Sequence, residues 1–401
     1  MLTEAPAGLY EPAFEGTWPR FDLHSLASWV NGMAFKNSHF SLSGPPIVKI
    51  AEVKNGITAQ TKFTDGEHAP KYRLGDGDLL FCWSGQPETS IDAYLWSGGP
   101  GWLNQHIFKV LPNRDKVGKA YFYYLLRYLR PTFVRIARNK QTTGLGHVTK
   151  ADLKRLSVGI PSREVQVAIT TALTILDEKI RSNRRRAQLA IQLAEQLLRS
   201  AIETAGSERV PLGDVAEFHN RRRVPLSRRV RDARPGPFPY YGATGVFGYV
   251  DDFLFDEVLV LVGEDGSVMN VDGSPVTQYI WGKSWINNHA HPITGLGVSS
   301  ELLFLALRAS DVRPLVTGAV QAKLSMGNLK SLPLGLPAGD VSNLEAALAT
   351  LFASYRQVAA ENVRLEGLFN AVLPELASGR LKVDGLKDVM TSGLVRCDSL
   401  Q

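Results

Sequence analysis

Two stretches of the chain carry hydrophobic or small residues at alternating steps of four and three, the pattern of a helix with one apolar stripe. One stretch follows Pro161 and the other follows Pro337. The first stripe consists of Ile169, Leu173, Leu176, Ile180, Asn183, Ala187, Ala190, Ala194 and Leu197. The second stripe consists of Leu344, Leu348, Leu351, Tyr355, Val358, Asn362, Leu365, Phe369 and Val372. Moving the first set by 175 positions gives the second, so the pattern repeats in register.

Both stretches predict long helices that pair with each other, because a stripe of this length must be buried against a partner helix. The first covers about 162–204 and at 1.5 Å per residue would be about 65 Å long. The second covers about 341–373, and Pro374 is expected to end or kink it. With their flanking residues, the two spacer helices are placed at 162–206 and 338–379.

The segment before each helix predicts a mixed domain built largely on a sheet. In the first, short β-like runs at 46–52 and 77–83 are separated by clusters of Gly, Pro, Asn and Ser. Helical periodicity occurs there only near 120–136. In the second, the apolar run at 257–263 predicts a buried strand.

The two domains also match in the order of their features. Trp102-Leu-Asn-Gln-His106 in the first corresponds to Trp285-Ile-Asn-Asn-His289 in the second, 183 positions later. The prolines that close the domains, Pro161 and Pro337, are 176 positions apart. We therefore predict an α/β fold of the α+β type, with two sheet-based domains, two long helices and a pseudo-twofold repeat. The domains are placed at 1–161 and 207–337, and a C-terminal tail at 380–401.

Composition agrees with a soluble protein of two or three domains, since the chain has 401 residues and 44% hydrophobic content. Two cysteines cannot make a disulfide framework, and no close Cys/His cluster predicts a zinc site. The first twenty residues do not resemble a signal peptide, and no stretch approaches 18 apolar residues, so no membrane span is expected. We expect a cytoplasmic protein.

Positive charge is concentrated in one short segment. Between Arg221 and Arg234 there are seven arginines and one acid, Asp232, so this segment accounts for the whole net charge of +6. A basic loop of this kind suits contact with phosphates, because guanidinium groups pair with phosphate oxygens. The alternative is a solvated surface loop. A second basic run, at 184–186, is expected on the solvated face of the first helix.

No stretch of the sequence indicates a catalytic or metal site. Gly282-Lys283-Ser284 lacks the glycine-rich turn of a phosphate-binding loop. His289 and His291 have no third ligand in view, which favours hydrogen-bonded histidines over a metal pair. Gly263-Glu-Asp-Gly266 follows a predicted strand but lacks the lysine of a nuclease site. The Asn/Asp-Pro-Pro-aromatic motif of amino-methylating enzymes is also absent.

Taken together, the motifs and the repeat resemble the specificity (S) subunit of type I restriction-modification systems, and the resemblance covers nearly all of the chain. Gly-Gly-Pro-Gly-Trp-Leu-Asn-Gln-His in the first domain and Pro-Tyr-Tyr-Gly-Ala-Thr-Gly in the second are typical of different subclasses of recognition domain. The family-like segments are 46–56, 77–85, 98–106, 239–245, 248–252 and 263–266.

The resemblance implies both a fold and a role. It implies two target recognition domains whose helices pack antiparallel as a spacer, and no catalytic site or cofactor in this chain. Each domain would bind one half-site of a bipartite double-stranded DNA target. The partners would be two methylating (M) subunits that use S-adenosylmethionine and restriction (R) subunits that use ATP and Mg²⁺. A helix of about 65 Å could hold two domains one to two turns of DNA apart, at about 34 Å per turn.

The two half-sites should differ, since one domain holds the whole excess of arginine. The residues that we expect to contact DNA are Arg221, Arg222, Arg223, Arg228, Arg229, Tyr240, Tyr241, Lys140, Gln141 and His147. The alternative for the tyrosines is packing in the core, and for Lys140 and His147 an ordinary surface loop.

Two other functions remain open from the sequence. The chain could be the specificity part of a fused type II methylating-restricting enzyme and contribute to catalysis. It could instead be an interaction scaffold that acts through its coiled coil. A scaffold predicts no footprint on DNA, whereas a recognition subunit predicts two protected patches separated by an indifferent gap.

Overall fold

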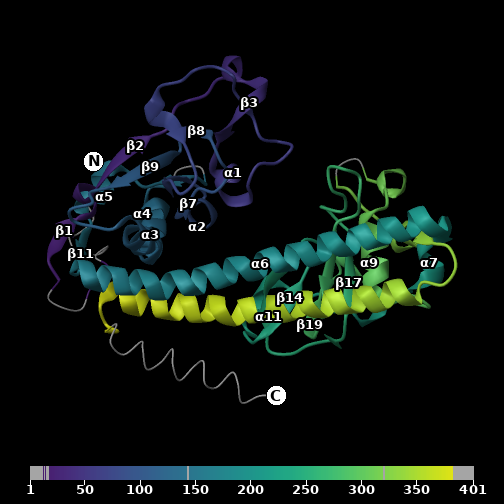
Figure 1. Ribbon diagram of the computed structural model, residues 1–401. Helices are drawn as coiled ribbons and strands as arrows, with labels where there is room; N and C mark the ends of the chain where they lie inside the picture. The colour runs from purple at the N-terminus through teal and green to yellow at the C-terminus, as the bar shows by residue number, and fades with distance from the viewer. Residues whose placement is uncertain (1–11, 13, 15–17, 142–143, 319–320, 383–401) are drawn as a thin grey trace. The chain divides into compact units, whose positions relative to one another are not determined.

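The computed structural model describes residues 12, 14, 18–141, 144–318 and 321–382, which form two compact units (Figure 1). Unit 1 comprises residues 1–180 together with 363–401, and unit 2 comprises residues 181–362. Each unit therefore contains one sheet-based portion and part of both long helices. Most of the tail that we predicted at 380–401 lies outside the described residues.

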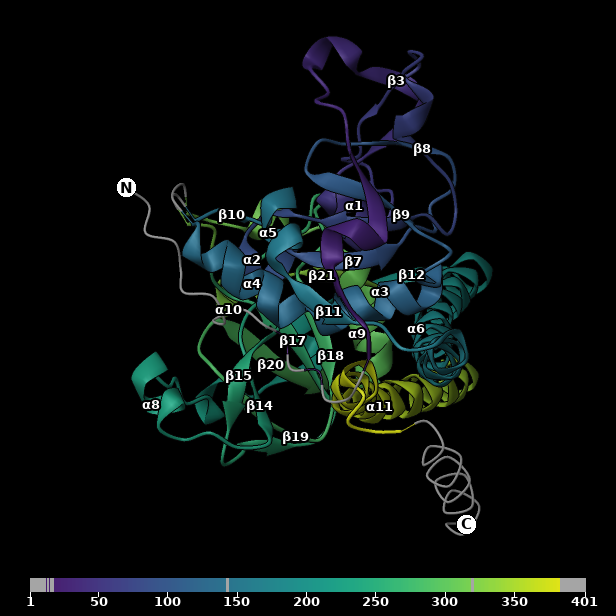
Figure 2. The ribbon, with the colours of Figure 1, turned by 90° about the vertical axis from the view of Figure 1, so that its left-hand side faces the viewer.

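The two long helices occur as predicted. α6 spans Arg163–Ala205 and α11 spans Ser342–Ser378. In unit 1 the beginning of α6 packs with the end of α11, and in unit 2 the end of α6 packs with the beginning of α11, so the helices are antiparallel (Figures 1 and 2). All positions of both predicted stripes are buried or half-buried. The apolar spacing thus identified the packed faces correctly.

We predicted that the second helix ends near Leu373 and that Pro374 ends or kinks it. The predicted end was wrong. α11 continues through Pro374 to Ser378. A proline so close to the end of a helix removes only one backbone hydrogen bond of the last turns. Leu376 and Ala377 compensate for this loss, because both are buried in the core of unit 1. The helix is followed by Gly379, whose φ of 83° is readily adopted only by glycine.

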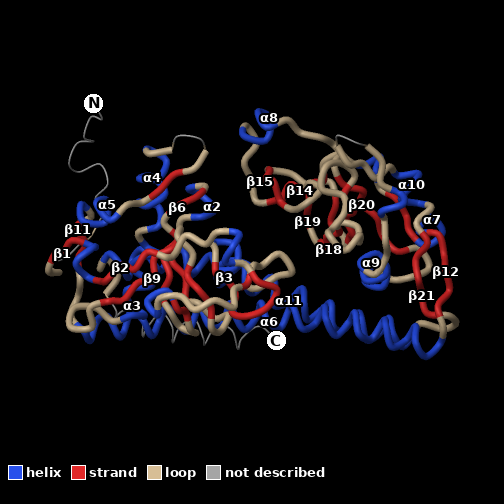
Figure 3. The backbone as a smooth tube through the Cα atoms, turned by 90° about the horizontal axis from the view of Figure 1, so that it is seen from above, coloured by secondary structure: helices blue, strands red, loops and turns tan. Residues whose placement is uncertain are grey.

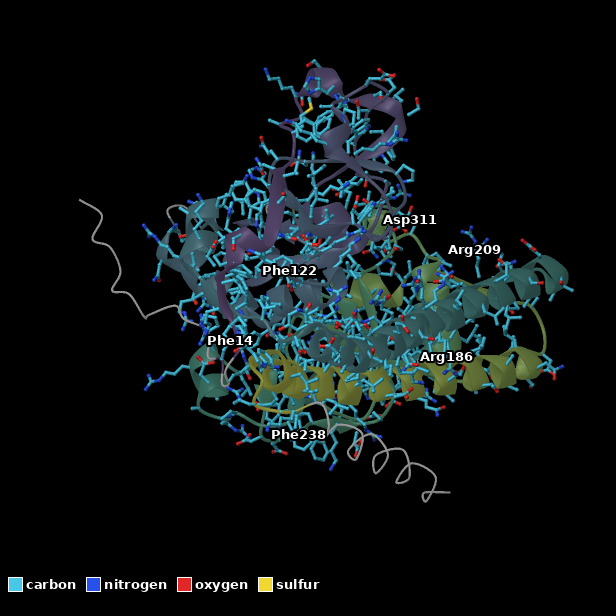
Figure 4. All side chains as sticks on the ribbon, turned by 60° about the vertical axis from the view of Figure 1, so that its left-hand side comes forward. Phe14, Phe122, Arg186, Arg209, Phe238 and Asp311 are labelled. Atoms are coloured by element: carbon cyan, nitrogen blue, oxygen red, sulfur yellow. The ribbon has the colours of Figure 1, made fainter. Side chains whose placement is uncertain are left out.

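The arginines at 184–186 are exposed, as expected for a solvated helix face (Arg186 in Figure 4). Close to them the apolar stripe contains a polar residue, Asn183, which is completely buried. Its Nδ2 donates a hydrogen bond to the Glu361 carboxylate over 2.7 Å. A buried polar residue in such a stripe favours one register of the helix pair over others.

The main sheet of unit 1 has the order β2-β9-β5-β7, and all neighbours are antiparallel. A second sheet has the order β3-β8-β4, with β3 parallel and β4 antiparallel to β8. The strands are β2 (Ala27–Asn31), β3 (Ser41–Val48), β4 (Arg73–Leu74), β5 (Leu79–Cys82), β7 (Asp92–Leu95), β8 (Gly101–Leu103) and β9 (Ile107–Pro112).

Unit 2 repeats this topology. Its main antiparallel sheet has the order β13-β20-β17-β18, and its second sheet has the order β15-β14-β19-β16. In the second sheet β14 is parallel and β16 antiparallel to β19. The strands are β13 (Ala216–Phe218), β14 (Phe238–Tyr241), β15 (Val246–Val250), β16 (Phe255–Asp256), β17 (Leu259–Gly263), β18 (Thr277–Ile280), β19 (Lys283–Ile286) and β20 (Ala290–Gly295).

The Trp-to-His correspondence seen in the sequence marks equivalent strands. Trp102 on β8 pairs with Ile47 of β3, and Trp285 on β19 pairs with Tyr240 of β14, both in parallel. Short antiparallel ladders also close both domains next to the long helices. They join β1 (Arg20–Asp22) to β11 (Ser157–Gly159), and β12 (Ser207–Pro211) to β21 (Pro333–Pro337).

In each unit a short apolar helix lies between the main sheet and the long helices. In unit 1 this is α3 (Lys119–Tyr128), whose Phe122 (labelled in Figure 4) contacts Trp29 of β2 while its Tyr124 contacts Phe369 of α11. In unit 2 it is α9 (Ser300–Arg308), whose Phe304 contacts Tyr279 of β18 and Phe352 of α11. Both helices are buried on every side over six consecutive residues, because they form the middle layer.

The remaining elements are short. The α-helices are α1 (Ile50–Asn55), α2 (Pro87–Ser90), α3 (Lys119–Tyr128), α4 (Arg130–Asn139), α5 (Lys150–Arg155), α7 (Leu212–Val215), α8 (Arg228–Asp232), α9 (Ser300–Arg308) and α10 (Met326–Lys330). The 3-10 helices are η1 (Leu23–Leu26), η2 (Asn37–His39), η3 (Pro70–Tyr72), η4 (Asn220–Arg222) and η5 (Arg313–Leu315), and the remaining strands are β6 (Ser84–Gly85) and β10 (Gly146–His147).

The contact of α11 with the core of unit 2 leads to a stability prediction. Phe352 is completely buried and touches the rings of Tyr279 and Phe304. Phe352→Ala should therefore leave a cavity and lower the free energy of unfolding by about 3–5 kcal/mol. Leu368→Ala on the same helix is the control, because Leu368 is exposed and its change should be below about 0.5 kcal/mol. Chemical denaturation measures both, and equal effects would contradict this packing.

Candidate nucleic-acid interface

The arginine-rich stretch at 221–234, which we call the arginine segment, connects β13 to β14 in unit 2. It lies on the side of this unit away from α6 (α8 in Figures 2 and 3). The segment has local structure of its own, since it contains the end of η4 and all of α8. Ser227 caps α8, with its side chain accepting a hydrogen bond from the Val230 backbone N–H.

Two arginines at the start of the segment hold it against the sheets. Arg222 lies 2.7 Å from the Glu257 carboxylate, and its guanidinium sits 4.1 Å above the centre of the Phe255 ring. Arg223 lies 2.6 Å from the Glu264 carboxylate and also donates to the carbonyl oxygens of Asn288 and Ala290. The Arg223 side chain is only 14% exposed, so its charge is used inside the unit.

Two further arginines hold the other end of the segment. Arg231 donates to the Leu226 carbonyl over 2.8 Å and stacks on the Tyr240 ring. Arg234 lies 2.8 Å from the Asp251 carboxylate and over the ring of Trp285. The Trp285 indole in turn donates to the backbone carbonyl of Val224. Four of the seven arginines therefore brace the segment.

The other three arginines, Arg221, Arg228 and Arg229, are exposed. Among the described residues, Arg221 and Arg229 have no ion pair. Arg228 has one with Asp232 at 3.7 Å, but both side chains are largely exposed, so solvent screens this pair and it contributes little. These three guanidinium groups are the ones that no anchoring contact holds, so they are the most available to a phosphate backbone; Arg222 is also 45% exposed but is paired with Glu257. Arg222 and Arg223, which we also expected to contact DNA, serve mainly as anchors.

The two tyrosines beside the segment have different environments. Tyr240 is 1% exposed, and its hydroxyl accepts a hydrogen bond from the Leu226 N–H over 2.9 Å. This matches the alternative of core packing. In this conformation the Tyr240 side chain is too buried to contact DNA. Tyr241 is half-buried and lines a cleft of about 420 Å³ in unit 2 together with Trp281 and Tyr355. Burial raises the pKa of the Tyr241 hydroxyl.

The groups beneath the segment form a hydrogen-bonded cluster. His291 is fully buried, its Nε2 lies 2.8 Å from the Leu324 carbonyl, and its Nδ1 lies 2.8 Å from the Asn220 amide nitrogen. The geometry fits an imidazole that donates from Nε2 and accepts at Nδ1. Burial lowers the pKa of His291, which favours this neutral form. His291 is therefore a hydrogen-bonded histidine, as the sequence favoured.

The two carboxylates of the Gly263–Gly266 turn do not converge on one point. Glu264 pairs with Arg223, whereas Asp265 lies 3.7 Å from Lys323 and 3.5 Å from His289. Lys323 is a lysine near this turn that the sequence pattern did not reveal. Over the described ranges, no group of three or more His, Cys, Asp or Glu side chains could hold a metal ion. Within the same ranges, no helix is long and apolar enough to cross a membrane.

In unit 1, the three expected contact residues lie after α4 and on β10. Both Asp152 carboxylate oxygens lie 2.6 Å from the Lys140 ammonium, which is thereby engaged within the unit. Burial of Asp152 opposes its ionisation, but hydrogen bonds from Lys140 and Thr149 outweigh burial and lower its pKa. Gln141 is exposed and His147 is half-buried on β10. The next residues, 142–143, lie outside the described residues.

The acids that anchor the arginine segment were missed by sequence reasoning. Glu257, Glu264 and Asp251 are separated from their arginines by 17 to 41 positions, and no local spacing connects them. The sequence placed Glu257 at the start and Glu264 just after the end of a predicted buried strand, but it gave no sign that they pair with arginines.

Comparison with known proteins assigns most of the chain to one family. The family model described as "Type I restriction modification DNA specificity domain" matches it twice, at residues 15–191 and 205–341. Among solved structures, the S subunit of a type I restriction-modification system from M. genitalium is similar in fold. That crystal structure covers 90% of this chain and 96% of its own, with a TM-score of 0.52 and 14% identity.

Curated relatives match over shorter stretches. A provisionally named type I restriction enzyme specificity subunit of Haemophilus influenzae is 32% identical over 35% of this chain and 36% of its own length. The specificity subunit of the type I enzyme EcoBI from Escherichia coli is 25% identical over 49% of this chain and 40% of its own length. The chain thus spans about two fifths of the length of these relatives.

The family model covers well over half of the chain, and its two matches each include one sheet-based domain of the repeat. This confirms the family resemblance that the motifs and the alternating spacing of four and three indicated. The chain belongs to the family of type I restriction-modification DNA specificity proteins.

Proposed function

We propose that the chain is the DNA sequence-recognition subunit of a type I restriction-modification enzyme and has no catalytic activity by itself. The observation that carries this proposal is the braced arginine segment, which presents Arg221, Arg228 and Arg229 to solvent. Guanidinium groups pair well with phosphate oxygens. A segment that is already held in place loses little conformational freedom when it binds. Its anchors therefore favour binding by holding the segment in place.

The target would be bipartite and asymmetric, with one half-site per unit. The equivalent strands of the two units support two separate binding domains of one design. The connections between these strands differ, since the segment from β13 to β14 is rich in arginine and the one from β2 to β3 contains none. Different side chains in equivalent positions recognise different base edges. The half-sites should differ accordingly.

The partners would be two methyltransferase subunits, with restriction subunits in the complete complex. S-adenosylmethionine, ATP and Mg²⁺ would bind to those subunits and not to this chain. Family membership supports this assembly, and the long paired helices are a surface on which partner subunits could pack. The alternatives are a specificity chain that is fused to catalysis in a type II enzyme, and a scaffold that acts through the coiled coil alone.

Footprinting on DNA separates these functions. The purified full chain should protect two patches of its target, separated by a gap of indifferent sequence, and should not cleave DNA when Mg²⁺ is added. Metal-dependent cleavage by the chain alone would favour the fused enzyme. A complete lack of protection on a genomic fragment library would favour the scaffold.

The exposed arginines should determine how strongly binding depends on salt. In Arg221→Ala/Arg228→Ala/Arg229→Ala, binding to every DNA sequence should weaken. The slope of log affinity against log salt should fall by about 0.9 for each phosphate that the variant no longer neutralises. Fluorescence anisotropy with labelled duplexes at several salt concentrations measures both effects. The matched control replaces the same three residues by lysine, which keeps the charge and should keep most of the slope.

A different result would overturn this assignment. If the alanine variant lost discrimination at one base pair but kept its non-specific affinity, these arginines would be base-reading groups. Arg223→Ala provides a contrast, because this anchor lies against Glu264 and should act on stability. Its removal should lower the free energy of unfolding by roughly 1.5–3 kcal/mol, the value of hydrogen bonds to a charged group.

The spacer helices should set the length of the gap between half-sites. Four residues inserted into one helix add about 6 Å at 1.5 Å each. At 3.4 Å per base pair, this should lengthen the gap by roughly one or two base pairs and leave both half-sites unchanged. Binding selection from randomised DNA measures the gap, and an unaltered gap would rule out this role. Replacing the arginines at 184–186 by lysine keeps the helix length and serves as the control.

A further inference from the structure

The connection between β2 and β3 in unit 1 is the topological counterpart of the arginine segment in unit 2. Each connection leaves the edge strand of the main sheet and enters the strand that pairs in parallel with the tryptophan strand. We define this connection and the start of β3 as the β2–β3 arch, residues 32–46. None of the DNA contacts that we expected from the sequence lies in this arch.

The arch has a definite shape that carries one leucine into solvent. Ser41 and Pro46 both pair with Phe63 on the neighbouring segment, so the four residues between them bulge outward. All four are exposed, and Leu42 is completely so. Backbone hydrogen bonds fix the C-terminal side of the bulge to the facing segment, from Thr64 N–H to the Pro45 carbonyl and from Ile47 N–H to the Lys62 carbonyl. Figures 1 and 2 show β3 at the end of unit 1 that is remote from α6.

The base of the arch is braced by aromatic groups, much as the arginine segment is braced at Trp285. His68 packs edge-on against Trp102, at 5.0 Å between ring centres, and equally against Phe35 in the arch. Gly44 has a φ of 104°, and a Cβ atom there would lie 2.4 Å from the Thr64 carbonyl oxygen. The chain path that presents Leu42 is therefore specified by its neighbours and is not a random loop.

The arch differs from the arginine segment in its charge. It contains one charged residue, Lys36, and the facing segment 61–68 contains one lysine and two acids. Such a surface gains little from phosphates, whose attraction is electrostatic. A projecting aliphatic side chain can instead contact the methyl group of thymine or the apolar parts of base edges. It can also wedge between base steps.

We propose that Leu42 is a specificity-determining residue that reads bases of the half-site bound by unit 1. This inference rests on the proposed function and names one of its contacts. It predicts a division of labour, in which unit 2 contributes salt-dependent phosphate contacts through arginine and unit 1 discriminates bases through an apolar group.

The test is selection from a randomised double-stranded DNA library by the full chain and its variants. The wild-type chain should select two conserved blocks. Leu42→Ala should lose discrimination at one or two positions within one block, on the order of tenfold. Its affinity for non-specific DNA and the salt dependence of that affinity should not change. Leu42→Met keeps the apolar contact and should restore most of the discrimination.

Leu111→Ala is the matched control, because Leu111 is another exposed leucine of unit 1 and lies on β9. It should select the wild-type blocks. Since the Leu42 side chain is fully in solvent, Leu42→Ala should unfold at the same temperature as the wild type. Unchanged blocks with Leu42→Ala would overturn this inference and leave DNA recognition intact. No conserved block with the wild-type chain would overturn the recognition function and the inference together.

Discussion

The burial of one apolar stripe on each of two long helices is the interaction on which the rest of the structure depends. In unit 1 the stripe does more than join the helices, since Leu173 and Phe369 belong to the same core as the apolar helix α3. In unit 2, Ala194 and Leu348 of the stripes join the core around α9 in the same way. Neither domain closes its core without both helices. Each core is therefore complete only when α11 has packed against α6.

The helix pair also has to select one register among several that would bury similar area. The completely buried Asn183 lies in the apolar stripe, and in the observed alignment it donates a hydrogen bond to Glu361. A buried amide costs stability compared with leucine, but a shifted register would leave it without this partner. A protein that would hold two binding surfaces at a set spacing needs one defined register of its helices. That need outweighs the small loss of stability from the buried amide.

A comparable balance of charge governs the arginine segment. A run of seven arginines repels itself, yet Glu257, Glu264 and Asp251 each neutralise one of them from a different part of unit 2. Stacking on aromatic rings holds the guanidinium of Arg231 without an acid. What remains exposed is a smaller charge on a fixed frame. In unit 1 the equivalent frame carries a leucine, so one architecture presents two chemically different surfaces.

Periodicity alone determined the two helices, their packed faces and the repeat, because the spacing of apolar residues directly reflects which side of a helix is buried. The matched tryptophans likewise identified equivalent strands, since Trp102 and Trp285 occupy the same place in the topology. The extension of α11 past Pro374 was not predictable, because it depends on the burial of Leu376 in a distant core. The division of the arginines into anchors and exposed groups, and the exposure of Leu42, were decided only by the tertiary structure. These features depend on which distant carboxylates and strands come into contact, and no local spacing in the sequence records such contacts.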